Sequence, residues 1–148
     1  MIRIALVGDI GSGKTFYSKL FKYPVFNADL VVSNLYQKDK SLFRKIKKKF
    51  PNKISNFPLK KQEVLKIIFQ KQKNLNVLGK IIHPIVRKKM KNFMKTNKNK
   101  KFVILDIPLF LENFFHLDCK LHHKRIYYYQ TCLALSQNFH FLIRHLLH

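Results

Sequence analysis

The feature that most constrains the fold of this chain is a glycine-rich loop near its amino terminus. Residues 2–7 form an apolar run rich in β-branched side chains, and residues 8–15 continue it as Gly-Asp-Ile-Gly-Ser-Gly-Lys-Thr. This spacing matches Gly-x-x-x-x-Gly-Lys-[Ser/Thr], the phosphate-binding loop that joins a buried strand to a helix. The sequence therefore predicts a strand at residues 2–7, then a phosphate-binding loop, then a helix.

Each fixed position of the loop has a physical role. Glycines let the backbone turn so that several N–H groups point at one phosphate chain. Lys14 adds a positive charge for the terminal phosphates, and Thr15 offers a hydroxyl to Mg²⁺. The following helix directs the positive end of its dipole at the same anions. The residues expected to contact nucleotide are Gly8, Ile10, Gly11, Ser12, Gly13, Lys14, Thr15 and Phe16.

Length and charge limit the function classes. A chain of 148 residues is expected to form one domain. Its formal net charge of +23, from 30 Lys and Arg against 7 Asp and Glu, favours anionic ligands. Nucleic acid is one such ligand, but AT-rich coding DNA would also enrich Lys, Asn, Ile and Phe, and the lysines are dispersed. Phosphorylated metabolites therefore remain the expected partners, with nucleic acid as the alternative.

Cysteine content and hydropathy predict a cytoplasmic protein. Two cysteines, Cys119 and Cys132, without a secretory leader indicate a reducing compartment and no disulfide framework. No apolar run approaches the roughly 20 residues needed to span a bilayer. The spacing of the two cysteines with His122 and His123 does not match a zinc-binding pattern. We therefore expect no membrane segment and no structural metal.

A second strand is predicted at residues 25–27, followed by Asp29. In an open parallel sheet the carboxyl ends of the strands line the ligand crevice, so Asp29 is a candidate catalytic carboxylate. Local sequence alone favours the other role, in which Asp29 is the N-cap of the helix with Val32, Leu35 and Tyr36 on its apolar face. The two roles are compatible.

Residues 31–95 are predicted to be a helical lobe. A basic amphipathic helix spans about residues 41–50, and another begins at Pro58. Helical spacing then continues to Pro84, where proline is expected to end one helix and begin the next. That break would place His83 and Arg87 near a helix N-terminus, where His83 is either a packing residue or a ligand-binding one. The core face expected after Pro58 comprises Val64, Leu65, Ile67, Ile68 and Phe69.

A third strand is predicted at residues 102–106. It is fully apolar and ends in Asp106. In phosphate-loop proteins a carboxylate at such a strand end commonly holds Mg²⁺, while the alternative is a simple turn residue. From residue 114 onward the composition changes, with six of the seven histidines, no proline and no glycine. No strand is expected in residues 114–148, which are predicted to form an atypical tail that is either a helical cover or poorly ordered.

Four segments in this order resemble the dephospho-CoA kinase family. They are the glycine loop, Asn27-Ala28-Asp29, His83-Pro84-Ile85-Val86-Arg87, and Leu105-Asp106-Ile107-Pro108-Leu109-Phe110-Leu111-Glu112. The resemblance covers residues 1–113. It implies an α/β, P-loop nucleotide-kinase fold, a parallel sheet with helices on both faces and a helical acceptor-binding insert. It also implies MgATP-dependent phosphorylation of the 3′-hydroxyl of dephospho-CoA, the last step of coenzyme A synthesis.

The resemblance implies a role for individual residues. Asp29 would accept the proton of the 3′-hydroxyl, while His83 and Arg87 would face the acceptor. Pro108 and Glu112 would line the crevice. Lys14 would act on the transferred phosphoryl group, and Thr15 and Asp106 would hold Mg²⁺.

Two residues depart from the family pattern. Asn27 stands where the family usually has an aspartate, and Asp9 stands where it usually has glycine. A carboxylate cannot contact phosphate oxygens, so Asp9 is expected to point away from them. Both departures bear on metal geometry more than on the fold.

The tail also departs from the family, which continues with a further strand and an arginine-bearing lid. The change of composition after residue 113 resembles a reading-frame change or a divergent terminus. Because transfer to an alcohol needs a site closed to water, we expect nucleotide binding at weakened affinity and kinase activity that is low or absent. A basic nucleic-acid-binding protein and another small-molecule kinase that shares only the loop are the alternative functions. The sequence leaves the oligomeric state open.

Overall fold

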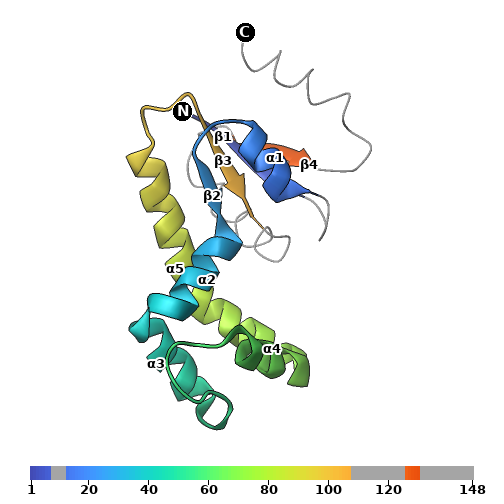
Figure 1. Ribbon diagram of the computed structural model, residues 1–148, viewed down its shortest axis with the longest axis vertical. Coiled ribbons are helices and arrows are strands. Elements are labelled where there is room, and N and C mark those ends of the chain that lie inside the picture. Colours follow the sequence, from blue (N-terminus) through green and yellow to red (C-terminus); the bar gives the residue numbers. More distant parts are fainter. Residues whose placement is uncertain (8–12, 108–125, 131–148) are drawn as a thin grey trace. The chain divides into compact units, whose positions relative to one another are not determined.

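The computed structural model describes the backbone of residues 1–7, 13–107 and 126–130 (Figure 1). Within these ranges it describes the side chains except those of Val7, Lys14, Thr15, Tyr17 and residues 126–130. The chain divides into two compact units. The sheet unit comprises Met1–Asn27 and Asn97–His148, and the helical unit comprises Ala28–Thr96.

The sheet unit is built on a parallel sheet. Its described strands are β1 (Ile2–Val7), β2 (Val25–Asn27), β3 (Phe102–Asp106) and β4 (Ile126–Gln130), in the spatial order β2-β3-β1-β4. Every described pairing is parallel. The three strands predicted from the sequence are confirmed, as is the α/β fold class. All five residues of β3 are buried, which explains why the four before Asp106 are apolar.

The expectation that residues 114–148 contain no strand is wrong. Strand β4 pairs with β1 over its whole length, in a register that sets Arg3 opposite Ile126 and Val7 opposite Gln130. Its sequence, Ile-Tyr-Tyr-Tyr-Gln, has the β-branched and aromatic residues that favour strands. It was missed because it shows neither alternation nor turn signals. As a result β1 is an interior strand.

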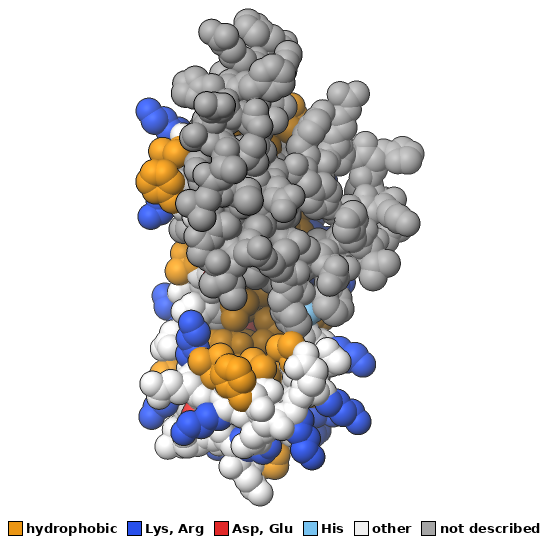
Figure 2. Space-filling view, turned by 90° about the vertical axis from the view of Figure 1, so that its right-hand side faces the viewer, with side chains coloured by type: hydrophobic (Ala, Val, Ile, Leu, Met, Phe, Trp, Pro, Cys, Tyr) orange, Lys and Arg blue, Asp and Glu red, His pale blue; other side chains and the backbone are white. Residues whose placement is uncertain are grey.

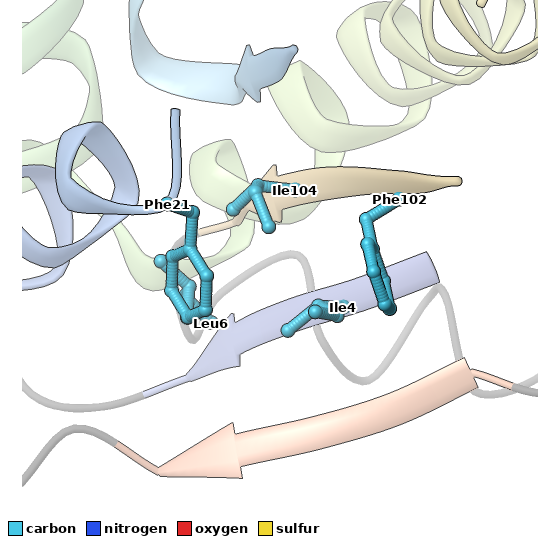
Figure 3. Close-up of a cluster of buried hydrophobic side chains, with 5 residues drawn as sticks. All are labelled: Ile4, Leu6, Phe21, Phe102 and Ile104. Carbon is cyan, nitrogen blue, oxygen red and sulfur yellow. The ribbon is translucent and has the colours of Figure 1, made fainter. Parts of the chain in front are cut away.

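A cluster of buried hydrophobic side chains packs on one face of this sheet (Figure 3). Ile4 and Leu6 project from β1 toward Phe102 and Ile104 of β3, and Phe21 packs on them from the end of helix α1. Alternate strand residues face the same side of a sheet, so this spacing brings all four strand side chains to one face. The half-buried residues Ile2, Tyr23 and Val25 pack around the cluster.

Helix α1 (Lys14–Leu20) follows the glycine loop and packs against β1, β2 and β3. The sequence spacing of Phe16, Leu20 and Phe21 predicts one apolar face for this helix, and this prediction is only partly correct. Phe21 is buried, but Phe16 is 65% exposed and Leu20 is also exposed. Ser18 is buried instead, because it lies one turn before Phe21 on the side that meets the sheet.

The helical unit consists of four α-helices and one short 3₁₀ helix among its residues, all of which are described. They are α2 (Ala28–Lys38), α3 (Lys40–Lys49), η1 (Pro51–Lys53), α4 (Lys61–Gln70) and α5 (Gln72–Thr96). Helix α5 packs against α2, α3 and α4. Asp39 caps α3, since its carboxylate accepts hydrogen bonds from the backbone N–H groups of Ser41 and Leu42, both at 2.9 Å. Neither α5 nor any other described helix meets the length and apolarity that a bilayer crossing requires.

The core face predicted for the segment after Pro58 is too wide. The helix begins at Lys61, and of the predicted apolar residues only Val64 and Ile67 are buried. Leu65 is 38% exposed and Phe69 is 83% exposed. At 100° per residue, Leu65 and Phe69 lie on the side of α4 away from Val64 and Ile67, so one line of contact cannot bury both pairs.

Proline does not divide α5, contrary to the sequence-based expectation. The helix runs through Pro84 without interruption. Its buried stripe, Leu78, Ile82, Val86 and Met90, repeats every four residues across the proline. Pro84 itself is exposed on the opposite side, where water can bind the carbonyl group that lacks a partner N–H. Burial of the stripe therefore outweighs the local preference for a break.

We expect Ile104→Ala to weaken the sheet unit strongly. Ile104 is fully buried in the hydrophobic cluster, and large-to-small changes in cores cost about 2–5 kcal/mol. Leu20→Ala is the control, because exposed side chains usually change stability by less than about 0.5 kcal/mol. Urea unfolding followed by circular dichroism measures both. Equal losses for the two variants would contradict the placement of the core.

Candidate functional site

The turn into α1 requires glycine. Gly13, immediately before the helix, has φ 79° and ψ 14°, in the left-handed region where glycine is favoured. Lys14 and Thr15 are the first two residues of α1, so the helix starts at the lysine of the motif as predicted. The other loop residues predicted to contact nucleotide, Gly8, Ile10, Gly11 and Ser12, lie outside the described part of the chain, as does Asp9.

Asp106 lies at the carboxyl edge of the sheet, between two strands. It is opposite Leu6 of β1 on one side and opposite Asn27 of β2 on the other. Its side chain is 5% exposed, and the Asn27 Nδ2–H group donates a hydrogen bond to Asp106 Oδ2 at 2.7 Å. One carboxylate oxygen is thus oriented by a neutral amide close to the strand end from which the glycine loop leaves.

The oxygen donors at this edge fit Mg²⁺, a hard cation that prefers carboxylates, hydroxyls and water. Asp106 supplies a buried carboxylate whose orientation Asn27 fixes. Mg²⁺ usually takes only one or two protein ligands, with phosphate and water completing its shell. Among the described residues no group of three or more His, Cys, Asp or Glu side chains is placed to hold a metal ion.

Asp29 is not the N-cap of α2, contrary to one of its two predicted roles. The helix already begins at Ala28, and Asp29 is its second residue, exposed and within the first turn. A carboxylate there interacts favourably with the positive end of the helix dipole. Asp29 follows the hydrogen-bonded Asn27 by two residues along the chain. Its carboxylate remains available for chemistry.

His83 and Arg87 lie in the middle of α5, one turn apart, and not near a helix N-terminus as predicted. The His83 side chain is 4% exposed. Burial, and secondly the positive charge of Arg87, hold the pKa of His83 below its usual value. The imidazole is therefore predominantly neutral near pH 7, with one nitrogen able to donate a hydrogen bond and the other able to accept one.

Sequence reasoning did not single out Gly79, which is one turn before His83 on α5. The side chain of His83 packs against it, in space that a Cβ atom at position 79 would enter. An isolated glycine within a helical pattern, four residues before a histidine, was the signal that could have drawn attention to it. The structure thus adds Gly79 to the surroundings of His83 and Arg87.

One pocket of about 490 Å³ lies on the helical unit, where α2 meets α3 and α5. Its lining on α2 lies on the side of that helix opposite to Asp29, given the 100° rotation per residue. It is therefore separate from the predicted site residue on the same helix. The lining residues are Val31, Asn34, Leu35, Lys38, Asp39, Lys40 and Lys89.

On the face drawn in Figure 2 the basic side chains form no single stripe. Figure 2 shows Lys and Arg side chains scattered around its coloured part, with hydrophobic side chains between them. Some lysines contact neighbours, since Lys47 Nζ donates to the Ser55 carbonyl oxygen at 2.8 Å and lies 5.6 Å from the centre of the Phe43 ring. Lys40 lies 5.9 Å from the centre of the Phe57 ring.

Comparison with known proteins gives one family. The profile of the dephospho-CoA kinase family matches residues 2–124. The dephospho-CoA kinase of Wolbachia sp. subsp. Brugia malayi is 36% identical over 121 residues, which cover 78% of this chain and 62% of that protein. The dephospho-CoA kinase of Bartonella henselae is 38% identical over 114 residues, covering 74% of this chain and 58% of that protein.

The fold has a solved counterpart. The dephospho-CoA kinase from Campylobacter jejuni superimposes with a TM-score of 0.65 and 13% identity, covering 99% of this chain and 96% of that one. At this identity the likeness concerns the fold alone.

The family match extends to residue 124, past the limit of 113 expected from the motifs. The chain spans only about 62% of the length of its Wolbachia relative. The predicted crevice residues Pro108 and Glu112 lie outside the described ranges.

Removal of the Asn27 amide tests the pairing at the sheet edge. Asn27→Ala takes away the hydrogen bond to Asp106, and hydrogen bonds to charged groups contribute about 1.5–3 kcal/mol. We expect a loss of unfolding free energy in this range. Asn34→Ala, at an exposed position of α2, is the matched control and is expected to change stability by less than about 0.5 kcal/mol. Urea denaturation compares the two, and indistinguishable midpoints would contradict the pairing.

Proposed function

The chain belongs to the dephospho-CoA kinase family, and on this basis we propose that it transfers the γ-phosphoryl group of ATP to the 3′-hydroxyl of dephospho-CoA. The family match over residues 2–124 is the observation that carries this proposal. It includes β1, α1 and every described residue of the helical unit. The reaction completes coenzyme A synthesis.

The nucleotide is proposed to bind at the turn between β1 and α1. Gly13 permits the tight backbone turn, and N–H groups at the start of α1 are proposed to donate to phosphate oxygens. The Lys14 ammonium group would neutralise charge on the phosphoryl group as it moves. Such transfers depend mainly on positioning and on fixed charges that meet the developing negative charge.

The acceptor hydroxyl is proposed to meet the carboxylate of Asp29. This carboxylate accepts the hydroxyl proton while the 3′-oxygen forms a bond to the γ-phosphorus, and the bond from that phosphorus to the β–γ bridging oxygen of ATP breaks. ADP leaves with that oxygen. Asp29 is exposed in the first turn of α2, so it can reach a ligand without first breaking a packed contact.

Mg²⁺, when bound, would neutralise phosphate charge in the site, and Thr15 and Asp106 are proposed to hold it. The Asn27 amide keeps the Asp106 carboxylate in one orientation through their 2.7 Å hydrogen bond. Because Asn27 is neutral, it places no second negative charge at this edge. We propose that Asn27 supports the carboxylate by this contact and is not itself a metal ligand.

The helical unit is proposed to bind the acceptor. Dephospho-CoA carries a diphosphate, and Arg87 offers a guanidinium group suited to phosphate oxygens. His83, neutral and nearly buried, would recognise a polar group of the acceptor by a hydrogen bond. Pro108 and Glu112 are also proposed to contact the acceptor. The partners are thus two small molecules, without nucleic acid or membrane, and the two cysteines of the chain fit a cytoplasmic location.

Lys14→Ala tests the nucleotide site. We expect kcat/KM for ATP to fall by about 10²–10³, as when one charge-stabilising donor is removed from an active site. We also expect a weaker Kd for ATP in calorimetry, because a phosphate contact is lost. Lys19→Ala is the matched control, since Lys19 is exposed in the last turn of the same helix. Unchanged ATP affinity in Lys14→Ala would show that the loop does not bind nucleotide.

Asp29→Asn tests the proposed base. The amide cannot accept the hydroxyl proton, so kcat is expected to fall by about 10²–10⁴ while the Kd for ATP stays the same. Ser33→Ala changes an exposed residue one turn further along α2 and is expected to keep its activity. Turnover is followed by coupling ADP release to a spectroscopic assay with dephospho-CoA as acceptor. Full activity of Asp29→Asn would remove this residue from the mechanism.

A further inference from the structure

Helix α5 contains a notch at Gly79 that the side chain of His83 fills. A Cβ atom at position 79 would lie 3.0 Å from Cε1 of His83, 3.4 Å from Nε2 and 3.6 Å from Nδ1. Carbon atoms pack without strain at about 3.5–4.0 Å, so the ring already occupies the space that any other side chain would need. Gly79 is buried, as is His83.

The imidazole has little room to move out of this notch. It is 4% exposed, and its side chain points back toward the preceding turn, as helical side chains do. The proline that follows fixes its own backbone angle φ directly after His83. The positive charge of Arg87 acts from the next turn. A displacement of the ring would therefore disturb the packing on the same side of α5.

Glycine at position 79 lowers the stability of the helix. In a helix interior it is less favourable than every residue except proline, because it loses the most backbone freedom on folding. Position 79 lies seven residues after the start of a 25-residue helix, far from either end, so no capping role explains it. The close approach of the His83 ring is the feature that does.

We propose that Gly79 is a positioning residue that sets the depth and orientation of the His83 imidazole on α5, and through it the binding of the acceptor. The inference rests on the proposed function, in which His83 and Arg87 face dephospho-CoA. A larger residue at 79 would displace the ring from the helix surface and misplace its hydrogen-bonding nitrogens relative to the Arg87 guanidinium group. The ATP site, built on the sheet unit, would be unaffected.

A double-mutant cycle tests the notch without any assay of function. Gly79→Ala is measured in the natural chain and in the His83→Ala background, by thermal unfolding. Without the ring, alanine is expected to raise Tm through its better helix propensity. With the ring present, the change in Tm is expected to be less favourable by at least about 3 °C, the usual response of a chain this long to a modest loss of stability.

Lys80→Ala is the control for this cycle. Lys80 is the exposed neighbour of Gly79, and its substitution is expected to shift Tm equally in both backgrounds. If Gly79→Ala also shifts Tm equally in both, the ring and position 79 do not interact and the inference is wrong.

Binding of dephospho-CoA tests the role proposed for Gly79 in positioning His83 for the acceptor. In calorimetry with the full chain, Gly79→Ala is expected to weaken the Kd for dephospho-CoA about tenfold and to leave the Kd for ATP unchanged. The ¹H–¹³Cε1 NMR signal of His83, assigned with His83→Ala, is expected to move in Gly79→Ala but not in Lys80→Ala. Coupling in the cycle with an unchanged Kd for dephospho-CoA would overturn the positioning role. Failure of the natural chain to bind dephospho-CoA would contradict the proposed function, while the cycle would still decide whether the notch exists.

Discussion

The parallel pairing of β1 with strands on both sides is the interaction on which the candidate site depends. Strand β1 hydrogen-bonds to β3 and to β4, so it lies in the interior of the sheet. Parallel strands end at the same edge, and this brings Leu6, Asp106 and Asn27 into register where the glycine loop begins. The cluster around Ile4 and Ile104 fixes that register, since a slip of one residue would turn these side chains to the other face.

The same register determines which polar side chains meet at the sheet edge. Asp106 is buried, and a buried carboxylate needs hydrogen-bond donors to offset its lost hydration. The amide of Asn27 supplies one from the adjacent strand. A carboxylate at position 27 would instead have placed a like charge beside Asp106. The pairing therefore gives an oriented oxygen donor with a single formal charge between the two side chains.

In the helical unit, burial of one stripe of α5 overrides two residues that disfavour helices. Gly79 and Pro84 both lie within this helix, yet Leu78, Ile82, Val86 and Met90 keep one face continuous against its neighbours. The tolerated glycine has a use, because it admits the His83 ring. Lysines of this unit contact aromatic rings, a backbone carbonyl group and, for Lys53, the side-chain amide oxygen of Gln70. These lysine side chains therefore do not define a separate site.

The sequence by itself determined the features that depend on neighbouring residues: strands β1, β2 and β3, the left-handed glycine before α1, and Asp106 at a strand end. Such features follow from local spacing and from the conformational freedom of glycine. Tertiary structure alone decided the pairing of Asn27 with Asp106, which are 79 positions apart, the strand status of residues 126–130, and the continuity of α5 through Pro84. It also decided that Phe69 is exposed while Ile67 is buried, although both are apolar residues of one helix. These outcomes depend on which surfaces pack together, and the sequence pattern of one segment does not specify the segment that will pack against it.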